Sequence, residues 1–218
     1  MMNVKLISYS QPPAGSELSD DLLHMVAYCA RVSNPGNQIN EATSEKLVKY
    51  LIKHQHWSPL EMVSACLEID TTRDIGRQLL RHRSFSFQEF SQRYADPTKD
   101  MAFVRRGARL QDPKNRQNSI DAAPQVVQDL WDIKQQEVIN KAREVYEWAI
   151  KEGIAKEQAR SVLPEGNTMS RLYVNGTLRS WIHYIQLRAE NGTQQEHMNI
   201  AKAVGKVIYE IFPLDDII

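Results

Sequence analysis

The sequence predicts an α+β fold, in which several helices and a few strands form one domain over residues 1–218. Three observations predict it. The chain has 218 residues, 42% of them hydrophobic and 25% charged, which is the profile of one globular domain. Apolar residues recur with a period of two in some segments and with a helical period in others. The strand segments do not alternate regularly with helices, so repeated βαβ units are not expected.

The first half of the chain predicts two strands and three helices. Residues 3–9 alternate as a strand does. Ser19 is expected to cap a helix over about 20–30. A second helix is expected from about Ser44 to the stop at HQHWSP, because its apolar side chains share one face. From Leu60 the period changes to two, which predicts a half-buried strand, and Thr72 is then expected to cap a short helix.

The middle of the chain predicts an extended segment, a long loop and the longest helix. Residues 84–94 read as extended, and residues 95–123 show no period, which is typical of a functional or mobile loop. Pro124 is well placed to begin a helix that Gly153 closes. One stripe of this helix is apolar: Val127, Trp131, Val138, Ala142, Val145 and Ala149.

The last third predicts one strand between helices. A short helix covers AKEQARSVL and ends before Pro164, and MSRLYV reads as a strand. Asn175-Gly176 predicts a turn, after which Thr177 is expected to cap a helix. The last helix runs from about Gln194 to Phe212.

Composition excludes several classes of protein. No apolar run approaches a membrane span, and no secretory signal can be read, so a cytoplasmic protein is expected that neither binds a membrane nor coats nucleic acid. Cys29 and Cys66 lie in apolar patterns that suit reduced thiols rather than nucleophiles.

Net charge is zero, yet residues 71–118 hold eleven Lys and Arg against five Asp and Glu. Nearly all are arginine, which favours an anionic small molecule as ligand.

One segment concentrates groups that bind anions and rings. RHRSFSFQEFSQRY, residues 81–94, combines three arginines with the small hydroxyls of Ser86 and Ser91, a carboxylate and phenylalanines. Taken alone, the segment is also compatible with a solvated surface, or with a module that binds RNA or single-stranded nucleic acid. His54 and His56 lack the Cys or carboxylate spacing of a zinc site, so no metal is expected.

The same segment resembles a family signature. Arg81-His82-Arg83, then Ser86, Glu89, Ser91 and Arg93, match the pattern RHR-x-x-S-x-x-E-x-S-x-R of the flavin-dependent thymidylate synthases. Similarity continues at ARVS (30–33), HQHWSPLE (54–61), ARSVLP (159–164) and RSWIHYIQLR (179–188). It therefore covers most of the chain.

The resemblance implies an enzyme that converts dUMP to dTMP. Methylenetetrahydrofolate would supply the carbon and FAD, reduced by NADPH, the hydride, without a cysteine nucleophile. It also implies an α+β subunit with a mostly antiparallel sheet, in a homotetramer whose subunits share active sites. A family member that binds nucleotide without turnover would keep every motif.

The resemblance also assigns residues. Arg188 is implied as the catalytic group that assists ionisation at the pyrimidine N3, because a guanidinium stays charged. Ser91 is interpreted as a ligand, because no base lies near it in sequence. Gln88, Thr177, His183 and Gly192 differ from the residues most common in the family. The implied dUMP set is Gln78, Leu79, Leu80, Arg81, Glu89, Phe90, Ser91, Gln92, Arg93, Arg160 and Arg188; the implied FAD set is Ser58, Arg81, His82, Arg83, Glu89, Thr177, Arg179 and His183.

Overall fold

A computed structural model describes residues 2–214 and confirms the α+β class. Its main sheet has four strands in the order β1-β2-β6-β3, and all neighbours are antiparallel. The strands are β1 (Asn3–Tyr9), β2 (Ser64–Thr72), β6 (Met169–Thr177) and β3 (Ser86–Glu89). β2 and β6 pair along their whole length, so the two central strands form the base on which the site elements are placed.

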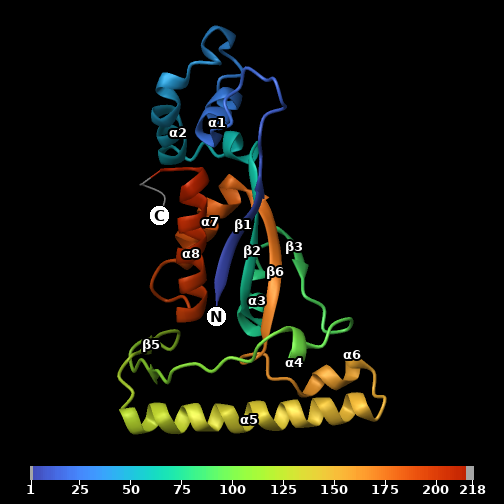
Figure 1. The fold of residues 1–218 in the computed structure, drawn as a ribbon. Helices are drawn as coiled ribbons and strands as arrows, with labels where there is room; N and C mark the ends of the chain where they lie inside the picture. Colours follow the sequence, from blue (N-terminus) through green and yellow to red (C-terminus); the bar gives the residue numbers. More distant parts are fainter. Residues whose placement is uncertain (1, 215–218) are drawn as a thin grey trace.

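The helices lie around this sheet as Figure 1 shows. α1 (Leu22–Ala30) and α2 (Ser44–Lys53) lie at one end, and α5 (Gln125–Lys151) crosses beyond the other end. α7 (Leu178–Arg188) and α8 (Gln195–Ile211) lie along one face, while α3 (Arg73–Leu79) follows β2 directly. The remaining elements are short: η1 (Pro35–Asn37), η2 (Glu41–Thr43), η3 (Ser58–Glu61), α4 (Pro97–Asp100), β4 (Leu110–Gln111), β5 (Ser119–Ile120), α6 (Lys156–Ala159) and η4 (Arg160–Val162).

Apolar periodicity builds the core between the sheet and α7 and α8. Ala65, Leu67 and Ile69 are buried from β2, as the period of two predicts. In β1 the register shifts between Leu6 and Ser8, so Tyr9 packs on the core in place of the next alternating residue. None of the helices within residues 2–214 is long and apolar enough to cross a bilayer.

Two predicted boundaries are wrong. α1 is capped by Asp21, whose carboxylate accepts from the Leu23 amide at 2.7 Å, rather than by Ser19. Ser19 instead accepts from the Asp21 amide at 3.2 Å, one step before the helix. The strand predicted from Leu60 begins at Ser64, because Ser58–Glu61 forms a 3₁₀ turn.

The turn predicted at Asn175-Gly176 is also wrong. Both residues lie inside β6, where Gly176 pairs with Ala65 of β2. A Cβ at Gly176 would lie 2.3 Å from the Phe85 ring, so glycine lets this ring lie against the strand. The glycine therefore serves a close approach between β6 and the turn after α3. Thr177 does cap α7, as predicted, by accepting from the Ser180 amide.

Within the segment without a period, residues 104–109 are held by hydrogen bonds from side chains. Every second residue of 104–109 bonds through its backbone to a side-chain amide. Gln135 accepts from the Arg106 amide and donates to its carbonyl, both at 2.8 Å, and Gln128 does the same for Ala108. Asn167 donates to the Val104 carbonyl at 2.9 Å. Residues 104–109 therefore lie beside α5. The backbones of Arg106 and Ala108 bond to side chains of this helix rather than to a neighbouring strand.

The predicted apolar stripe of α5 divides between two environments. Ala149 packs with Tyr146, Ala159 and Leu163, and Ala142 is also buried. Val127, Trp131 and Val138 are 39%, 46% and 53% exposed, so only part of the predicted apolar stripe is buried. The helix carries apolar residues on more than one side, so periodicity alone cannot say which side this chain covers.

Candidate active site

The turn that holds Arg81, His82 and Arg83, here called the RHR turn, meets the end of α7 through one hydrogen bond. Arg188 Nε donates to Nε2 of His82 at 3.1 Å, although 106 residues separate them. Ser180 Oγ also donates to the Ser84 carbonyl, so α7 lies along the turn. Burial lowers the pKa of His82, and the charges of Arg188 and Arg81 lower it further. A neutral ring with a bare Nε2 is the form that can accept from arginine.

Behind His82 lies a cluster of rings that the resemblance did not assign. The centroid of the His82 ring is 5.1 Å from that of Tyr184 and 6.3 Å from that of His197, and both neighbours are buried. His197 Nδ1 lies 3.1 Å from Oε1 of Gln78, a predicted dUMP residue. The tyrosine hydroxyl and Nε2 of His197 have no hydrogen-bond partner within the described chain. A histidine in the apolar stripe of α8 was the available sequence signal for this cluster.

Glu89 is bonded by side chains of its own chain. Its carboxylate accepts from Arg73 at 3.2 Å, from Arg77 at 3.3 Å and from Ser170 at 3.0 Å. These contacts join the end of β3 to α3 and β6, beneath the RHR turn. Glu89 was predicted to contact both ligands, and here it also holds two arginines in place.

An arginine-lined cavity of about 390 Å³ lies beside this ion cluster. Gln92 and Arg160 from the predicted dUMP set line it, together with Arg73 and Arg77, which were not predicted. Gln92 is 3% exposed, and its Nε2 lacks a partner among residues 2–214. Buried amides without a partner are uncommon, and three guanidinium groups suit a phosphate. The cavity also holds Glu157, Leu163, Glu165 and Ser161.

The rest of the predicted dUMP set lies in other places. Ser91, Phe90 and Glu89 line a second cavity of about 420 Å³ on the outer side of β3 and β6. Ser91 Oγ accepts from the Arg93 amide, while the Arg93 side chain pairs with Glu157 at 3.2 Å. Leu79 is buried in the core and Leu80 packs against it; Arg81 is exposed on the turn.

The predicted FAD set lies along α7 and the RHR turn. Ser58, in η3, is exposed next to Trp57, whose ring meets His183 edge to face at 4.3 Å. Arg179 pairs with Glu61 of the same turn. Exposed guanidinium groups beside aromatic rings are a fitting donor set for a flavin nucleotide. His183 is exposed, and Thr177 uses its hydroxyl to cap α7.

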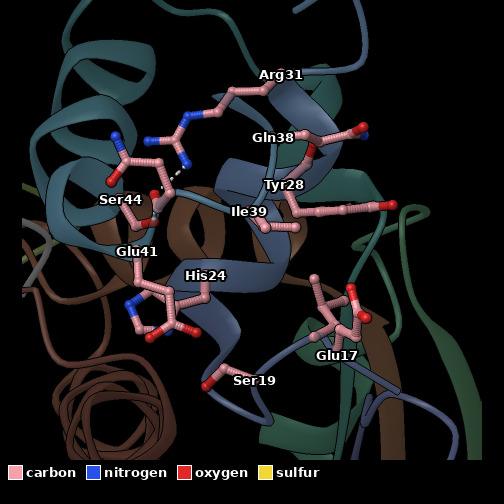
Figure 2. Close-up of a pocket in the computed structure, with 11 residues that line it drawn as sticks. Glu17, Ser19, His24, Tyr28, Arg31, Gln38, Ile39, Glu41 and Ser44 are labelled. Atoms are coloured by element: carbon pink, nitrogen blue, oxygen red, sulfur yellow. Dashed lines mark hydrogen bonds and ion pairs between the residues drawn. The ribbon is translucent and has the colours of Figure 1, made fainter. Parts of the chain in front are cut away.

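The ARVS motif has a structural role in this chain. Figure 2 shows Arg31 reaching from α1 to the turn before α2, where it donates to the Asn40 carbonyl at 2.5 Å and to Thr43 Oγ1 at 2.8 Å. His24 lies beside Glu41 in the same recess, with 3.7 Å between Nδ1 and the carboxylate. The enclosed space is about 10 Å³, which is room for one water molecule.

The fold and these sites define an α+β protein with arginine-lined cavities suited to phosphorylated, ring-bearing ligands. The family model described as thymidylate synthase complementing protein matches residues 17–214. The chain belongs to this family, that of the flavin-dependent thymidylate synthases.

Relatives and solved structures agree with this assignment. The chain is 47% identical over 213 residues to the probable flavin-dependent thymidylate synthase of Paramecium bursaria Chlorella virus 1, covering 97% of this chain and 96% of the relative. It is 46% identical over 215 residues to the flavin-dependent thymidylate synthase of Synechocystis, with the same coverage. The UMP/dUMP methylase PolB from Streptomyces cacaoi, bound with 5-Br dUMP, has the same fold: TM-score 0.81, 24% identity, covering 98% of this chain and 92% of that one.

Proposed function

We propose that this protein methylates dUMP to dTMP. Methylenetetrahydrofolate is the carbon donor, and FAD reduced by NADPH carries the hydride. Family membership supports the reaction class. The observation that carries the proposal for this chain is the hydrogen bond between Arg188 and His82, which joins the RHR turn to the arginine assigned to catalysis.

Arg188 has the chemistry that the reaction requires. Carbon–carbon bond formation at C5 of the pyrimidine requires negative charge to build on the ring, and a permanent cation beside N3 stabilises that charge. His82 accepts from Nε and thereby fixes the plane of the guanidinium group. The terminal nitrogens of Arg188 would then donate to the pyrimidine ring.

The proposal needs no cysteine nucleophile. Cys29 in α1 and Cys66 in β2 are half-buried, and burial raises the pKa of both thiols. A raised pKa reduces the thiolate fraction at neutral pH, and the thiolate is the nucleophile. Neither cysteine forms a disulfide in the described part of the chain, which suits a cytoplasmic protein.

The arginine-lined cavity is the proposed seat of the nucleotide phosphate. Arg160 and Gln92 belong to the predicted dUMP set, and Arg73 and Arg77 extend it. Glu157 and Glu165 pair with neighbouring arginines, so an entering phosphate exchanges those contacts for its own. Ser91 lies outside this cavity, whereas Arg93 pairs with Glu157, which lines it. A set divided in this way is consistent with an active site shared between subunits of a homotetramer.

The proposed FAD site follows α7 and the RHR turn. When bound, FAD supplies hydride transfer, which no amino-acid side chain performs. Arg81, Arg83 and Arg179 would bind its phosphates, and Ser58 is an adaptable donor near the aromatic pair of Trp57 and His183.

The visible absorption spectrum of the purified protein tests this proposal. We expect flavin bands that bleach when NADPH is added without oxygen, and dTMP formation only when dUMP and methylenetetrahydrofolate are both present. Flavin reduction without dTMP would indicate a member that binds nucleotide without turnover. A colourless protein that takes up no added FAD would contradict the proposal, and salt-dependent RNA binding would then be measured.

A further inference from the structure

A chain of hydrogen bonds runs from the 104–109 segment into the cluster behind the RHR turn. It begins at Arg109, whose Nη2 donates to the two carboxylate oxygens of Glu196 at 2.7 and 2.9 Å. Burial alone would raise the pKa of Glu196, but donation from Arg109 and Gln194 lowers it below its ordinary value. The carboxylate is therefore ionised at neutral pH and can only accept hydrogen bonds.

This carboxylate fixes two amide groups in turn. Gln194 Nε2 donates to Glu196 Oε2 at 3.0 Å, and only the NH₂ end of an amide can face a carboxylate. The Oε1 of Gln194 then accepts from Gln78 Nε2 at 2.8 Å. Gln78 must therefore direct its own Oε1 the other way, where it lies 3.1 Å from Nδ1 of His197.

The tautomer of His197 follows from the same logic. A carbonyl oxygen only accepts, so Nδ1 of His197 carries the hydrogen. The ring is fully buried, and its pKa is lowered to about 4, first by burial and then by the charge of Arg188. His197 is therefore a neutral donor with one orientation. Each hydrogen bond between Glu196 and His197 therefore has only one possible donor.

We propose that His197, Gln194 and Glu196 are positioning residues that hold the Gln78 amide in one orientation for dUMP. This inference rests on the proposed function, in which Gln78 contacts the nucleotide. An amide offers two N–H donors and two lone pairs, and the chain uses one of each. Gln78 is partly exposed, so one donor and one acceptor remain for the ligand. A flipped amide would present the opposite groups, which costs affinity.

Substitutions at His197 separate positioning from packing. His197→Leu removes the donor, whereas His197→Asn keeps an N–H near the position of Nδ1. We measure dUMP affinity by calorimetry, and KM and kcat on the FAD-loaded enzyme. His197→Leu should weaken dUMP binding about three- to tenfold, the range for one lost hydrogen bond. The flavin spectrum and the KM for NADPH should stay unchanged, and His197→Asn should recover most of the dUMP affinity.

Glu196→Gln tests the other end of the chain and keeps the proposal testable if His197→Leu does not fold. It replaces one acceptor oxygen by NH₂ at almost constant size, so the order of donors beyond it is lost. We expect a similar loss of dUMP affinity, and a double variant no weaker than the weaker single variant, because both act through Gln78. The control is Glu144→Gln, which changes an exposed partner of Lys141 on α5 and should not alter dUMP affinity.

The outcomes distinguish this inference from the proposed function. If the parent binds dUMP and either His197→Leu or Glu196→Gln binds it equally well, the inference is overturned and the proposed function stands. Equal weakening by His197→Leu and His197→Asn also overturns it, because only packing would then matter. A parent enzyme that binds no dUMP overturns the proposed function and the inference with it.

Discussion

Arg188 joins two sequence motifs through a single side chain. It reaches His82 from the last turn of α7, and its guanidinium group is a planar, cationic donor. We expect Arg188→Ala to lower kcat by about a hundredfold, the cost of one donor at a developing negative charge. Flavin content, read from the visible spectrum, should be retained.

A matched control removes the same charge elsewhere. Arg116 is exposed in the connection between β4 and β5, and Arg116→Ala should leave kcat unchanged. A turnover rate for Arg188→Ala equal to that of the parent would contradict the role assigned to Arg188.

His197 gives the fold a pH dependence of known sign. Its pKa is about 6.5 in the unfolded chain and about 4 in the folded chain. Between these pH values the unfolded chain binds a proton at His197 that the folded chain does not bind. The free energy of unfolding therefore falls as pH falls through this window. We expect His197 to contribute a loss of about 3 kcal/mol in unfolding free energy from pH 6.5 to pH 4. Urea titrations across this range should show a flatter pH dependence for His197→Leu; parallel curves would contradict the assignment.

At the scale of single residues, site assignments came from short motifs and from the resemblance that these motifs support. His82 and Arg188 were assigned because they lie in motifs that resemble those of the family, and Gln78 was implied by the same resemblance from its position before Arg81. The structure places all three in one cluster. Arg73 was not assigned, because nothing local distinguishes an arginine that lines a cavity from one in a solvated run. Its role follows from contacts with Glu89 and Glu165, which are distant in sequence.

At the scale of elements, prediction succeeded where burial has a period. β2, α3 and α7 were predicted because one face of each packs on the core, and burial selects apolar residues at that spacing. The Asn175-Gly176 turn failed because a strong local signal was overridden by pairing along β2 and by the approach of Phe85. The 104–109 segment had no signal, since its partners are amide side chains of α5 and of the segment before β6.

The attachment of this segment to α5 can be tested at Gln135. Gln135→Leu removes both hydrogen bonds to the Arg106 backbone at a position that is 4% exposed. We expect a loss of about 2 kcal/mol in unfolding free energy and faster hydrogen exchange at the Arg106 amide, because buried backbone groups lose their partners.

Gln136 provides the matched control for this change. It lies one position further along α5 and bonds only within the helix in the described structure, to Asn140. Gln136→Leu should leave exchange at residue 106 unchanged. Equal protection in the Gln135→Leu variant and the parent would show that the segment is held by its ion pairs alone.

At the scale of the whole molecule, the candidate site is divided. Residues of the predicted dUMP set line two separate cavities and the His82 cluster, so one chain presents parts of a site in three places. Subunits that share active sites would combine parts from different copies. One surface available for such contacts is the uncovered side of α5.

The exposed apolar side of α5 is where we expect copies of the chain to meet. Val126, Leu130 and Ile133 are 63%, 53% and 52% exposed at helical spacing, beside the exposed Trp131 and Val138. A group of exposed apolar side chains on one helix is typical of an interface. Sedimentation equilibrium should give the parent a mass of about 100 kDa, four copies of the 25.1 kDa chain. Leu130→Asp should lower both mass and dTMP formation, because a charge would be buried between copies, whereas Arg116→Asp, at an exposed position between β4 and β5, should change neither. A monomeric parent at micromolar concentration would refute shared active sites, and the three parts of the site would then have to close within one chain.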